Sequence, residues 1–202
     1  MLSVTTVHGE LKKSKTEDKL GMLSDQEIID IILRDGGRDD YAELFRRYRP
    51  KVLDKSYSLL RDSHLAKDIT NDILSRAYEK LPEFKGTSSF STWLYSIAYN
   101  YCIDYLRSKK KLHYPSWNSE HDLPEIVHVE EEDLTELNYS RLMSIMESIH
   151  PEEKALLLMK YQDEMTLKQI AGALRISESA VKMRLQRAKA RVLSLYKKNY
   201  KI

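Results

Sequence analysis

The chain has 202 residues, which is enough for one ordinary domain or for two small ones that each bury a core. Its 33 basic and 31 acidic residues nearly cancel, and the formal net charge of +2 identifies neither a strongly basic nor a strongly acidic protein. A single cysteine excludes a disulfide framework and a cysteine-based zinc site, and the six histidines include no pair at a metal-ligand spacing.

The sequence contains no apolar run near the roughly 20 residues that cross a bilayer, and its polar start lacks the core of a signal peptide. We therefore expect a cytoplasmic protein with no membrane insertion. The sequence shows no phosphate-binding loop, metal cluster or nucleophile–base arrangement, so an all-helical enzyme has little support and no cofactor is expected. Cys102 lies within a predicted helix, where a small, semi-buried apolar role is expected.

Charge is distributed unevenly along the chain. Residues 1–40 hold six basic and nine acidic residues, a net charge of −3, whereas residues 41–111 hold 14 and eight, a net of +6. Residues 112–137 hold no basic and eight acidic residues, a net of −8, and residues 138–202 hold 13 and six, a net of +7. Two basic blocks are thus separated by an acidic strip that contains two prolines. This composition predicts an extended linker, and the alternative is a solvated loop without a role.

Both basic blocks are predicted to be helical, because the chain has only six glycines and five prolines and its apolar residues recur at three-and-four spacing. Before them, the isoleucine-rich stretch 28–33 belongs either to a regulatory extension or to a helix that packs on the first block. In the first block, one apolar stripe consists of Tyr41, Leu44, Phe45, Tyr48 and Val52. A second stripe, after the cap-like pair Asp62–Ser63 and before Pro82, consists of Leu65, Ile69, Ile73 and Ala77.

A third helix of this block is predicted from near Ser91, after cap candidates at 87–89. Its core side would be formed by Phe90, Trp93, Leu94, Ile97, Tyr101 and Tyr105. The preceding loop, Phe84–Phe90, places small polar residues between two aromatic anchors and can accept an unstacked base. Beside the core face lies a second stripe, formed by Ser96, Asn100, Ile103 and Arg107. Lysines 109–111 end the helix, where simple capping of the helix dipole is the alternative to nucleic-acid contact.

The second block contains a helix-turn-helix pattern over residues 166–192. The first helix turns Leu167, Ile170 and Ala171 inward, and the second turns Val181, Leu185, Ala188 and Val192 inward. Ser177 is the expected N-cap of the second helix. Its outer face presents Ser179, Lys182, Met183 and Gln186, flanked by Arg184, Arg187 and Arg191.

Such a division suits DNA, because outward side chains near a helix N-terminus reach base edges in the major groove while flanking arginines reach phosphates. A plain basic surface helix is the alternative. Arg175 stands where such turns usually have glycine, and a positive φ there costs a non-glycine residue about 1 kcal/mol. Arg175 is instead expected to contribute a phosphate contact.

Both blocks, in this order and with this acidic linker, resemble an RNA polymerase sigma factor of the extracytoplasmic-function (ECF) group. The resemblance to the promoter-reading segment of sigma region two rests on Phe84, Lys85, Gly86, Ser88, Phe90, Thr92, Trp93, Leu94, Ile97, Ala98, Asn100, Asp104, Leu106 and Arg107. The segment Asp68–Asp72, followed by Arg76–Tyr78, resembles the family's polymerase-binding helix.

The resemblance implies an all-α protein of two small helical domains. Residues 1–40 would be a partly helical extension, 41–111 sigma region two, 112–137 a flexible acidic linker, and 138–202 the region-four helix-turn-helix. The linker's 26 residues could span at most roughly 85 Å, and its charge would suit the basic channel that later carries RNA.

The resemblance also implies a non-enzymatic specificity subunit that binds core RNA polymerase and directs transcription initiation at specific promoters. Core polymerase would be bound through its largest subunit by Asp68, Asn71 and Asp72, and through its second-largest subunit by the apolar outer surface of region four. The minus-10 element would be contacted by Lys85, Gly86, Ser88, Ser89, Phe90, Asn100 and Arg107. The minus-35 element would be contacted by Arg175, Ser177, Ser179, Lys182, Met183, Arg184, Gln186, Arg187 and Arg191.

Several positions depart from the family's pattern. Asn71 and Asp72 stand where glutamine and glutamate are common, and Ser179, Ala180 and Met183 replace the commoner glycine, threonine and serine. Base preference therefore cannot be carried over from relatives. A free-standing helix-turn-helix regulator remains the alternative, and the sequence leaves open the promoter, the inducing signal and whether an anti-sigma factor binds the chain.

Overall fold

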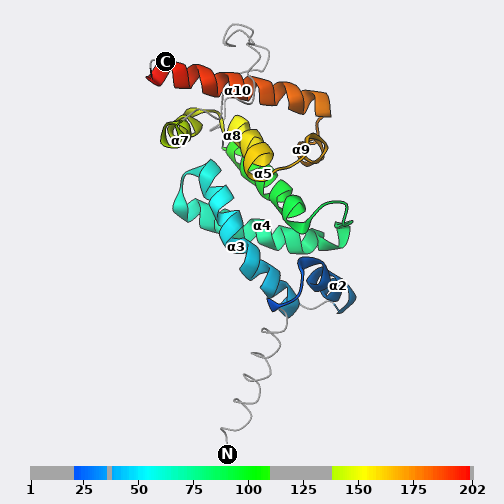
Figure 1. The fold of residues 1–202 in the computed structure, drawn as a ribbon. Coiled ribbons are helices and arrows are strands. Elements are labelled where there is room, and N and C mark those ends of the chain that lie inside the picture. The colour runs from blue at the N-terminus through cyan, green and yellow to red at the C-terminus, as the bar shows by residue number, and fades with distance from the viewer. Residues whose placement is uncertain (1–20, 36–37, 110–137, 201–202) are drawn as a thin grey trace, which may run out of the picture.

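The computed structural model describes residues 21–35, 38–109 and 138–200, which form helices and no β-strand (Figure 1). The N-terminal bundle comprises α2 (Asp25–Asp35), α3 (Arg38–Leu60), α4 (Ser63–Lys80), the short 3₁₀ turn η1 (Leu81–Glu83) and α5 (Phe90–Ser108). The C-terminal bundle comprises α7 (Tyr139–Ser148), α8 (Pro151–Leu157), the π-helical turn η2 (Leu158–Gln162), α9 (Leu167–Leu174) and α10 (Glu178–Tyr200). The all-α prediction is confirmed. The acidic linker 112–137 and the first 20 residues lie outside the described residues.

Local sequence signals account for the boundaries of α4. The Asp62 side chain accepts hydrogen bonds at 3.0 Å from the backbone N–H groups of His64 and Leu65, so the cap-like pair acts as predicted. The helix buries Ile69, Ile73 and Ala77 and ends at Lys80, directly before η1, which contains Pro82. Across the bundle, the Tyr41 hydroxyl donates to the Leu74 carbonyl at 2.6 Å, which joins α3 to α4.

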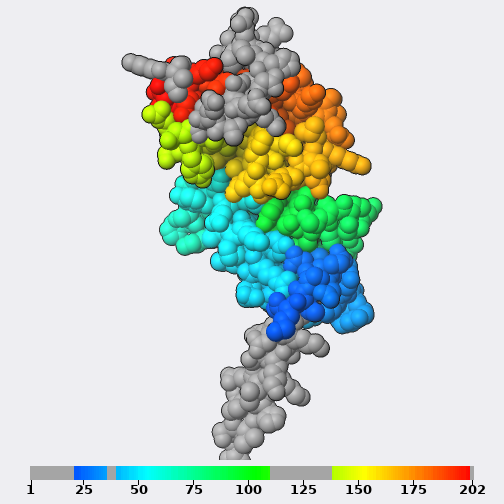
Figure 2. Space-filling model, in the orientation of Figure 1, coloured from blue at the N-terminus to red at the C-terminus, as the bar shows by residue number. Residues whose placement is uncertain are grey.

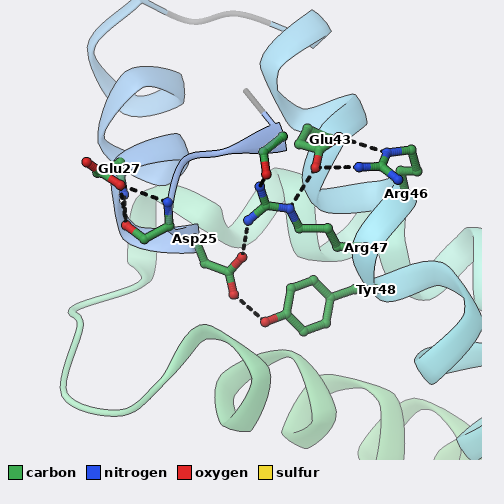
Figure 3. A network of polar contacts seen from close by, with 8 residues as sticks. Asp25, Glu27, Glu43, Arg46, Arg47 and Tyr48 are labelled. Atoms are coloured by element: carbon green, nitrogen blue, oxygen red, sulfur yellow. Dashed lines mark hydrogen bonds and ion pairs between the residues drawn. The ribbon is translucent and has the colours of Figure 1, made fainter. Parts of the chain in front are cut away.

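Helix α2 packs on α3, as the second of the two alternatives for the isoleucine-rich stretch expects. Ile28, Ile29 and Ile32 are buried in the core of the bundle. Figure 3 shows polar contacts between the start of α2 and α3: Asp25 binds the Arg47 guanidinium at 2.9 Å and also accepts a hydrogen bond from the Tyr48 hydroxyl. Residues 25–35 are therefore a helix of the bundle.

Helix α5 is covered on more than one side. Of its predicted core residues, Phe90 and Leu94 are buried, whereas the remainder are half-buried: Trp93, Ile97, Tyr101 and Tyr105. The buried set extends instead through Ala98, Tyr99, Cys102, Ile103 and Leu106. The physical reason is that α3 and α4 contact one side of α5 and the C-terminal bundle contacts another, which the periodicity of α5 alone does not reveal.

The two bundles touch directly. Helix α8 lies at the centre of the molecule and contacts α3, α5 and α10, while α9 packs on α5 (Figure 1). In the space-filling view, the yellow and orange residues of the C-terminal bundle lie against the cyan and green residues of the N-terminal bundle (Figure 2). Within the C-terminal bundle, Val181, Leu185, Ala188 and Val192 of α10 are buried, as predicted.

Candidate nucleic-acid interface

Helices α9 and α10 form the predicted helix-turn-helix. Helix α9 begins with a capping box, in which the Thr166 side chain accepts from the Gln169 N–H at 3.2 Å and the Gln169 side chain accepts from the Thr166 N–H at 2.8 Å. Arg175 ends the helix in the left-handed conformation, with φ 55° and ψ 44°. The position that usually holds glycine thus keeps its glycine-like backbone despite the arginine side chain.

Ser177 caps the start of α10, as predicted. Its hydroxyl accepts from the Ala180 N–H at 3.2 Å and shares a hydrogen bond with the Ser179 hydroxyl at 2.9 Å. With Val181 and Leu185 inward, Lys182 and Met183 point outward and are exposed, Met183 at 43%. This end of α10 therefore presents a hydroxyl, a cation and a flexible apolar side chain.

The residues on the flank of α10 are less exposed than those at its N-terminal end. Arg184, Gln186 and Arg187 are half-buried. Arg191 donates to the Glu153 carboxylate of α8 at 2.9 Å, so its guanidinium also holds α10 on α8. Burial raises the pKa of Glu153 more than Arg191 lowers it.

A closed aromatic cluster holds the loop between η1 and α5. Phe84 contacts the Phe90 ring edge-on at 5.9 Å and the Trp93 ring at 5.3 Å, and Tyr48 packs edge-on to Phe90 at 5.1 Å. The two predicted anchors therefore meet, and the residues between them project as a tight loop. Gly86 in this loop has a φ of 65°, which is unfavourable for other residues.

The candidate minus-10 residues of this loop occupy different environments. Lys85 and Gly86 are exposed and Ser88 is half-buried. Ser89 is the N-cap of α5, because its hydroxyl accepts from the Thr92 N–H at 3.2 Å. The Phe90 ring is buried, so its observed contacts are with the aromatic cluster.

The candidate minus-10 residues on α5 face the C-terminal bundle. The Asn100 side-chain amide donates to the Ala173 carbonyl of α9 at 2.6 Å. The Arg107 guanidinium binds the Glu152 carboxylate of α8, with nitrogen–oxygen distances of 2.7 and 2.9 Å. Ile103, between them on the same stripe, is buried.

A buried polar cluster joins the two bundles beside these contacts. The Lys55 ammonium of α3 lies 2.5 Å from Asp163 Oδ1, and the Tyr99 hydroxyl of α5 donates to Asp163 Oδ2 at 2.8 Å. Burial and the neighbouring Asp163 carboxylate raise the pKa of Tyr99 well above its ordinary value. The sequence analysis did not single out Lys55 or Asp163. A sequence signal exists for Lys55, which lies three residues after Val52 on an otherwise apolar face.

Helix α8 carries three consecutive charged residues that are all buried, Glu152, Glu153 and Lys154. They bind three different helices, since Glu152 binds α5, Glu153 binds α10, and Lys154 binds Glu147 of α7 at 2.6 Å. Arg61, directly after α3, also binds Glu147, at 3.0 Å. Burial lowers the pKa of His150, the N-cap of this helix.

The candidate polymerase-binding residues share one exposed face of α4. Asp68, Asn71 and Asp72 follow three-and-four spacing, and all three are exposed. Asp72 accepts a hydrogen bond from the Tyr101 hydroxyl at 3.1 Å. The face therefore offers acidic and amide oxygens on a rigid helix.

The C-terminal bundle also has an apolar groove of about 590 Å³ between α7, η2 and α10. Tyr139, Met143 and Tyr161 line it and are substantially exposed. Residues 21–35, 38–109 and 138–200 contain no group of three histidine, cysteine or acidic side chains that could hold a metal ion. None of the helices within these same ranges is long and apolar enough to cross a membrane.

Comparison with known proteins assigns both bundles to one family. Residues 44–112 match Sigma-70 region 2, and residues 139–192 match Sigma-70, region 4. The ECF RNA polymerase sigma factor SigW of Bacillus subtilis strain 168 is 28% identical over 171 residues, which cover 78% of this chain and 89% of SigW. The RNA polymerase sigma factor YlaC of the same organism is 28% identical over 156 residues, 75% of this chain and 89% of YlaC.

Solved structures support the fold. CnrH, in complex with the cytosolic domain of CnrY, aligns with a TM-score of 0.57 at 18% identity, over 85% of this chain and 96% of CnrH. The sigma factor RpoE from Bartonella quintana, in complex with the anti-sigma factor NepR, aligns with a TM-score of 0.55 at 17% identity, over 78% of this chain and 97% of RpoE. With both sigma regions matched in order and an ECF factor aligned across most of its length, the chain belongs to the ECF group of RNA polymerase sigma factors.

Proposed function

We propose that this sigma factor binds core RNA polymerase through the exposed face of α4 and reads promoters with two separate surfaces. The loop between η1 and α5, together with Asn100 and Arg107, would contact the minus-10 element. The outer face of α10 would contact the minus-35 element. The observation that carries the proposal is the helix-turn-helix of α9 and α10. The N-terminal end of α10 is capped and exposed, and the same chain contains a sigma region two.

The minus-35 assignment is supported by the chemistry of α10. Ser179, Lys182 and Met183 lie on its exposed side, where they can reach base edges when the helix enters the major groove. Arg184 and Arg187 flank them on α10 and would contact phosphates when the helix enters the groove. Arg175 would add a phosphate contact from the turn.

The minus-10 assignment is supported by the loop. The aromatic cluster beneath the loop holds Phe84 and Phe90 in place, whereas Lys85 and Gly86 are exposed. A flipped nucleobase can therefore approach the loop from an open side that carries a positive charge. Unstacking that base costs a few kcal/mol, which contacts in the bound state must offset. Promoter binding is therefore expected to depend on polymerase.

Polymerase would be bound at two places. The oxygens of Asp68, Asn71 and Asp72 suit basic partners on the largest subunit. The apolar groove beside Tyr139 and Met143 suits an apolar element of the second-largest subunit. Activity at the polymerase implies a cytoplasmic location. The complex of RpoE with the anti-sigma factor NepR makes an anti-sigma factor a partner to search for.

The test is transcription from a genomic promoter library with purified core polymerase, with and without the protein, followed by mapping of transcript starts. New start sites that need both components are expected. The substitution Asp68→Ala with Asn71→Ala should abolish them, whereas Lys67→Ala, an exposed change on the same helix, should not. Sequence-specific DNA binding by the protein alone, without polymerase association, would instead identify a free-standing regulator, which the region-two match does not favour.

A further inference from the structure

The aromatic cluster beneath the loop between η1 and α5 includes one ring from α3. Tyr48 is only 6% exposed, and its ring packs edge-on to Phe90, with 5.1 Å between the ring centroids, and to Tyr95, with 6.3 Å. Phe90 in turn contacts the rings of Phe84 and Trp93. A change in the orientation of the Tyr48 ring therefore changes the packing of Phe90 and, through it, of Phe84.

The hydroxyl group of Tyr48 is held by the first residue of α2. It donates a hydrogen bond to one carboxylate oxygen of Asp25, and the other oxygen binds the Arg47 guanidinium at 2.9 Å (Figure 3). Arg47 also binds the Glu43 carboxylate at 2.7 Å and the Gly21 carbonyl at 3.1 Å, so its own position is fixed. Burial and the bond with Asp25 raise the pKa of Tyr48, which keeps its hydroxyl protonated as the donor.

Helix α2 contacts both ends of the loop. It packs against η1, the turn that directly precedes Phe84, and its apolar face is buried in the core. Through Asp25 it also holds Tyr48, whose ring packs on Phe90 at the far end of the loop. Asp25 precedes residues 44–112, the part of the chain that matches Sigma-70 region 2. The support of the loop therefore extends beyond the matched region.

We propose that Asp25 is a positioning residue for minus-10 recognition. Its carboxylate orients Tyr48, and Tyr48 holds Phe90 and the loop in the conformation that accepts a flipped base. Helix α2 thereby contributes to promoter reading through Tyr48 rather than through a contact of its own with DNA. This role rests on the proposed function of the loop, whereas the effect of Asp25 on the aromatic cluster is measurable in the free chain.

The hydrogen bond affects recognition because the loop must be ordered before a base can bind. A loop that populates several conformations binds with an affinity reduced by the fraction of chains in the competent one. The bond between Asp25 and Tyr48 raises that fraction. When the bond is removed, the Tyr48 ring stays buried and the bundle stays folded, but the loop occupies the competent conformation less often.

Two substitutions break the bond from its two ends. Tyr48→Phe removes the hydroxyl and keeps the ring, and Asp25→Ala removes the carboxylate. The matched control is Arg46→Lys, which lies in the same polar network. It disrupts the paired contacts with Glu43, both at 2.8 Å, but keeps the positive charge and leaves the bond between Asp25 and Tyr48 in place. Circular dichroism and urea denaturation establish that each chain is folded, and Tyr48→Phe carries the test if Asp25→Ala is not.

The first measurement uses the free chain without DNA. The chain has two tryptophans, so Trp117→Phe leaves Trp93, which contacts Phe84 and Phe90, as the single tryptophan of this parent chain. Both bond-breaking substitutions should increase the quenching of its fluorescence by acrylamide, because the cluster around it loosens. The control should not change the quenching. Identical quenching in the parent chain and in both bond-breaking variants would overturn the positioning role.

Promoter binding by the holoenzyme is the second measurement. The probe is a single-stranded oligonucleotide with the minus-10 sequence of a promoter mapped in the library experiment. We expect both bond-breaking variants to bind it about fivefold more weakly than the parent chain, which is the effect of one lost hydrogen bond, and to bind core polymerase equally well. A merely structural role would lower the stability of the fold but leave the oligonucleotide affinity of the folded holoenzyme unchanged.

The double variant tests whether Asp25 acts through Tyr48. Because the single substitutions remove the same bond, the double variant should bind no more weakly than Asp25→Ala alone, and additive losses would overturn the proposal. Unchanged oligonucleotide affinity in both single variants would also overturn it and leave the proposed function intact. If the parent holoenzyme binds no oligonucleotide while the difference in quenching is present, the function proposed for the loop is wrong and the positioning of the cluster by Asp25 stands.

Discussion

Glu152 and Glu153 are neighbours in α8, yet they bind arginines of different bundles. Glu152 binds Arg107 of α5, and Glu153 binds Arg191 of α10. Successive residues of a helix point about 100° apart, so one short helix can face both bundles at once. The seven-residue α8 thereby binds helices of both sigma regions.

Replacing Arg175 by glycine should stabilise the protein while weakening its binding to promoter DNA. Arg175 has a φ of 55°, and relief of that conformation should raise the free energy of unfolding by about 0.5–1 kcal/mol. Urea denaturation measures the gain. The loss of a phosphate contact should lower promoter affinity of the holoenzyme in the same variant. Arg175→Lys, which retains both the charge and the backbone cost, should change neither; a destabilised glycine variant would contradict the backbone argument.

Two glycine-to-alanine substitutions should have opposite effects. Gly86 has a positive φ, so alanine should lower the free energy of unfolding by about 1 kcal/mol even though its Cβ would meet nothing within 4 Å. Gly172 lies inside α9 with open space around it, and alanine there should raise the free energy of unfolding by about 0.5–1 kcal/mol. Thermal unfolding of both variants under the same conditions checks the signs. A gain for Gly86→Ala would mean that the loop does not need its left-handed turn.

Stability should fall as the pH drops below about 6.5 because of His150. Its Nδ1 accepts the Glu152 N–H at 3.3 Å at the start of α8, which requires an unprotonated Nδ1. Burial lowers the pKa of His150 in the folded protein. Arg191 and Arg107 also lower this pKa, whereas Glu152 raises it. The unfolded chain therefore binds a proton at a higher pH than the folded chain. The contribution is complete above the unfolded pKa and is lost as the pH falls towards the folded pKa.

Urea denaturation between pH 7.5 and about 5.5 measures this effect. Burial raises the pKa of Glu153, which acts in the opposite direction, so the effect of His150 is read from the difference between the chain and a variant that lacks only this histidine. The control is His150→Asn, which keeps a side-chain acceptor at the N-cap but does not titrate. Its stability should depend less on pH in this window. An identical pH profile for the two chains would exclude His150 as the cause.

Substitutions on α10 should separate phosphate contact from base contact. Arg187→Ala should weaken holoenzyme binding on all promoters and reduce the slope of log affinity against log salt by about 0.9, because one fewer phosphate is neutralised. Met183→Ala should leave the slope unchanged and alter the preferred minus-35 bases. Salt titrations on a set of minus-35 variants measure both. A changed base preference in Arg187→Ala with an unchanged slope would reverse the two assignments.

The all-α class, the helix-turn-helix and the N-caps at Asp62 and Ser177 could be predicted from the sequence alone. These features depend on residues close together in the chain, whose spacing and hydrogen bonding the sequence displays directly. The inward face of α10 followed from the same periodicity.

The contacts of the second face of α5 could not be predicted from the sequence. Asn100 and Arg107 form a polar stripe in the sequence, but Ala173 and Glu152, which bind them, come from helices more than 40 residues away. Lys55 and Asp163 are 108 residues apart, and neither is adjacent to a recognisable motif. Local periodicity specifies that a face is polar or apolar, whereas the partner of that face depends on how distant helices pack.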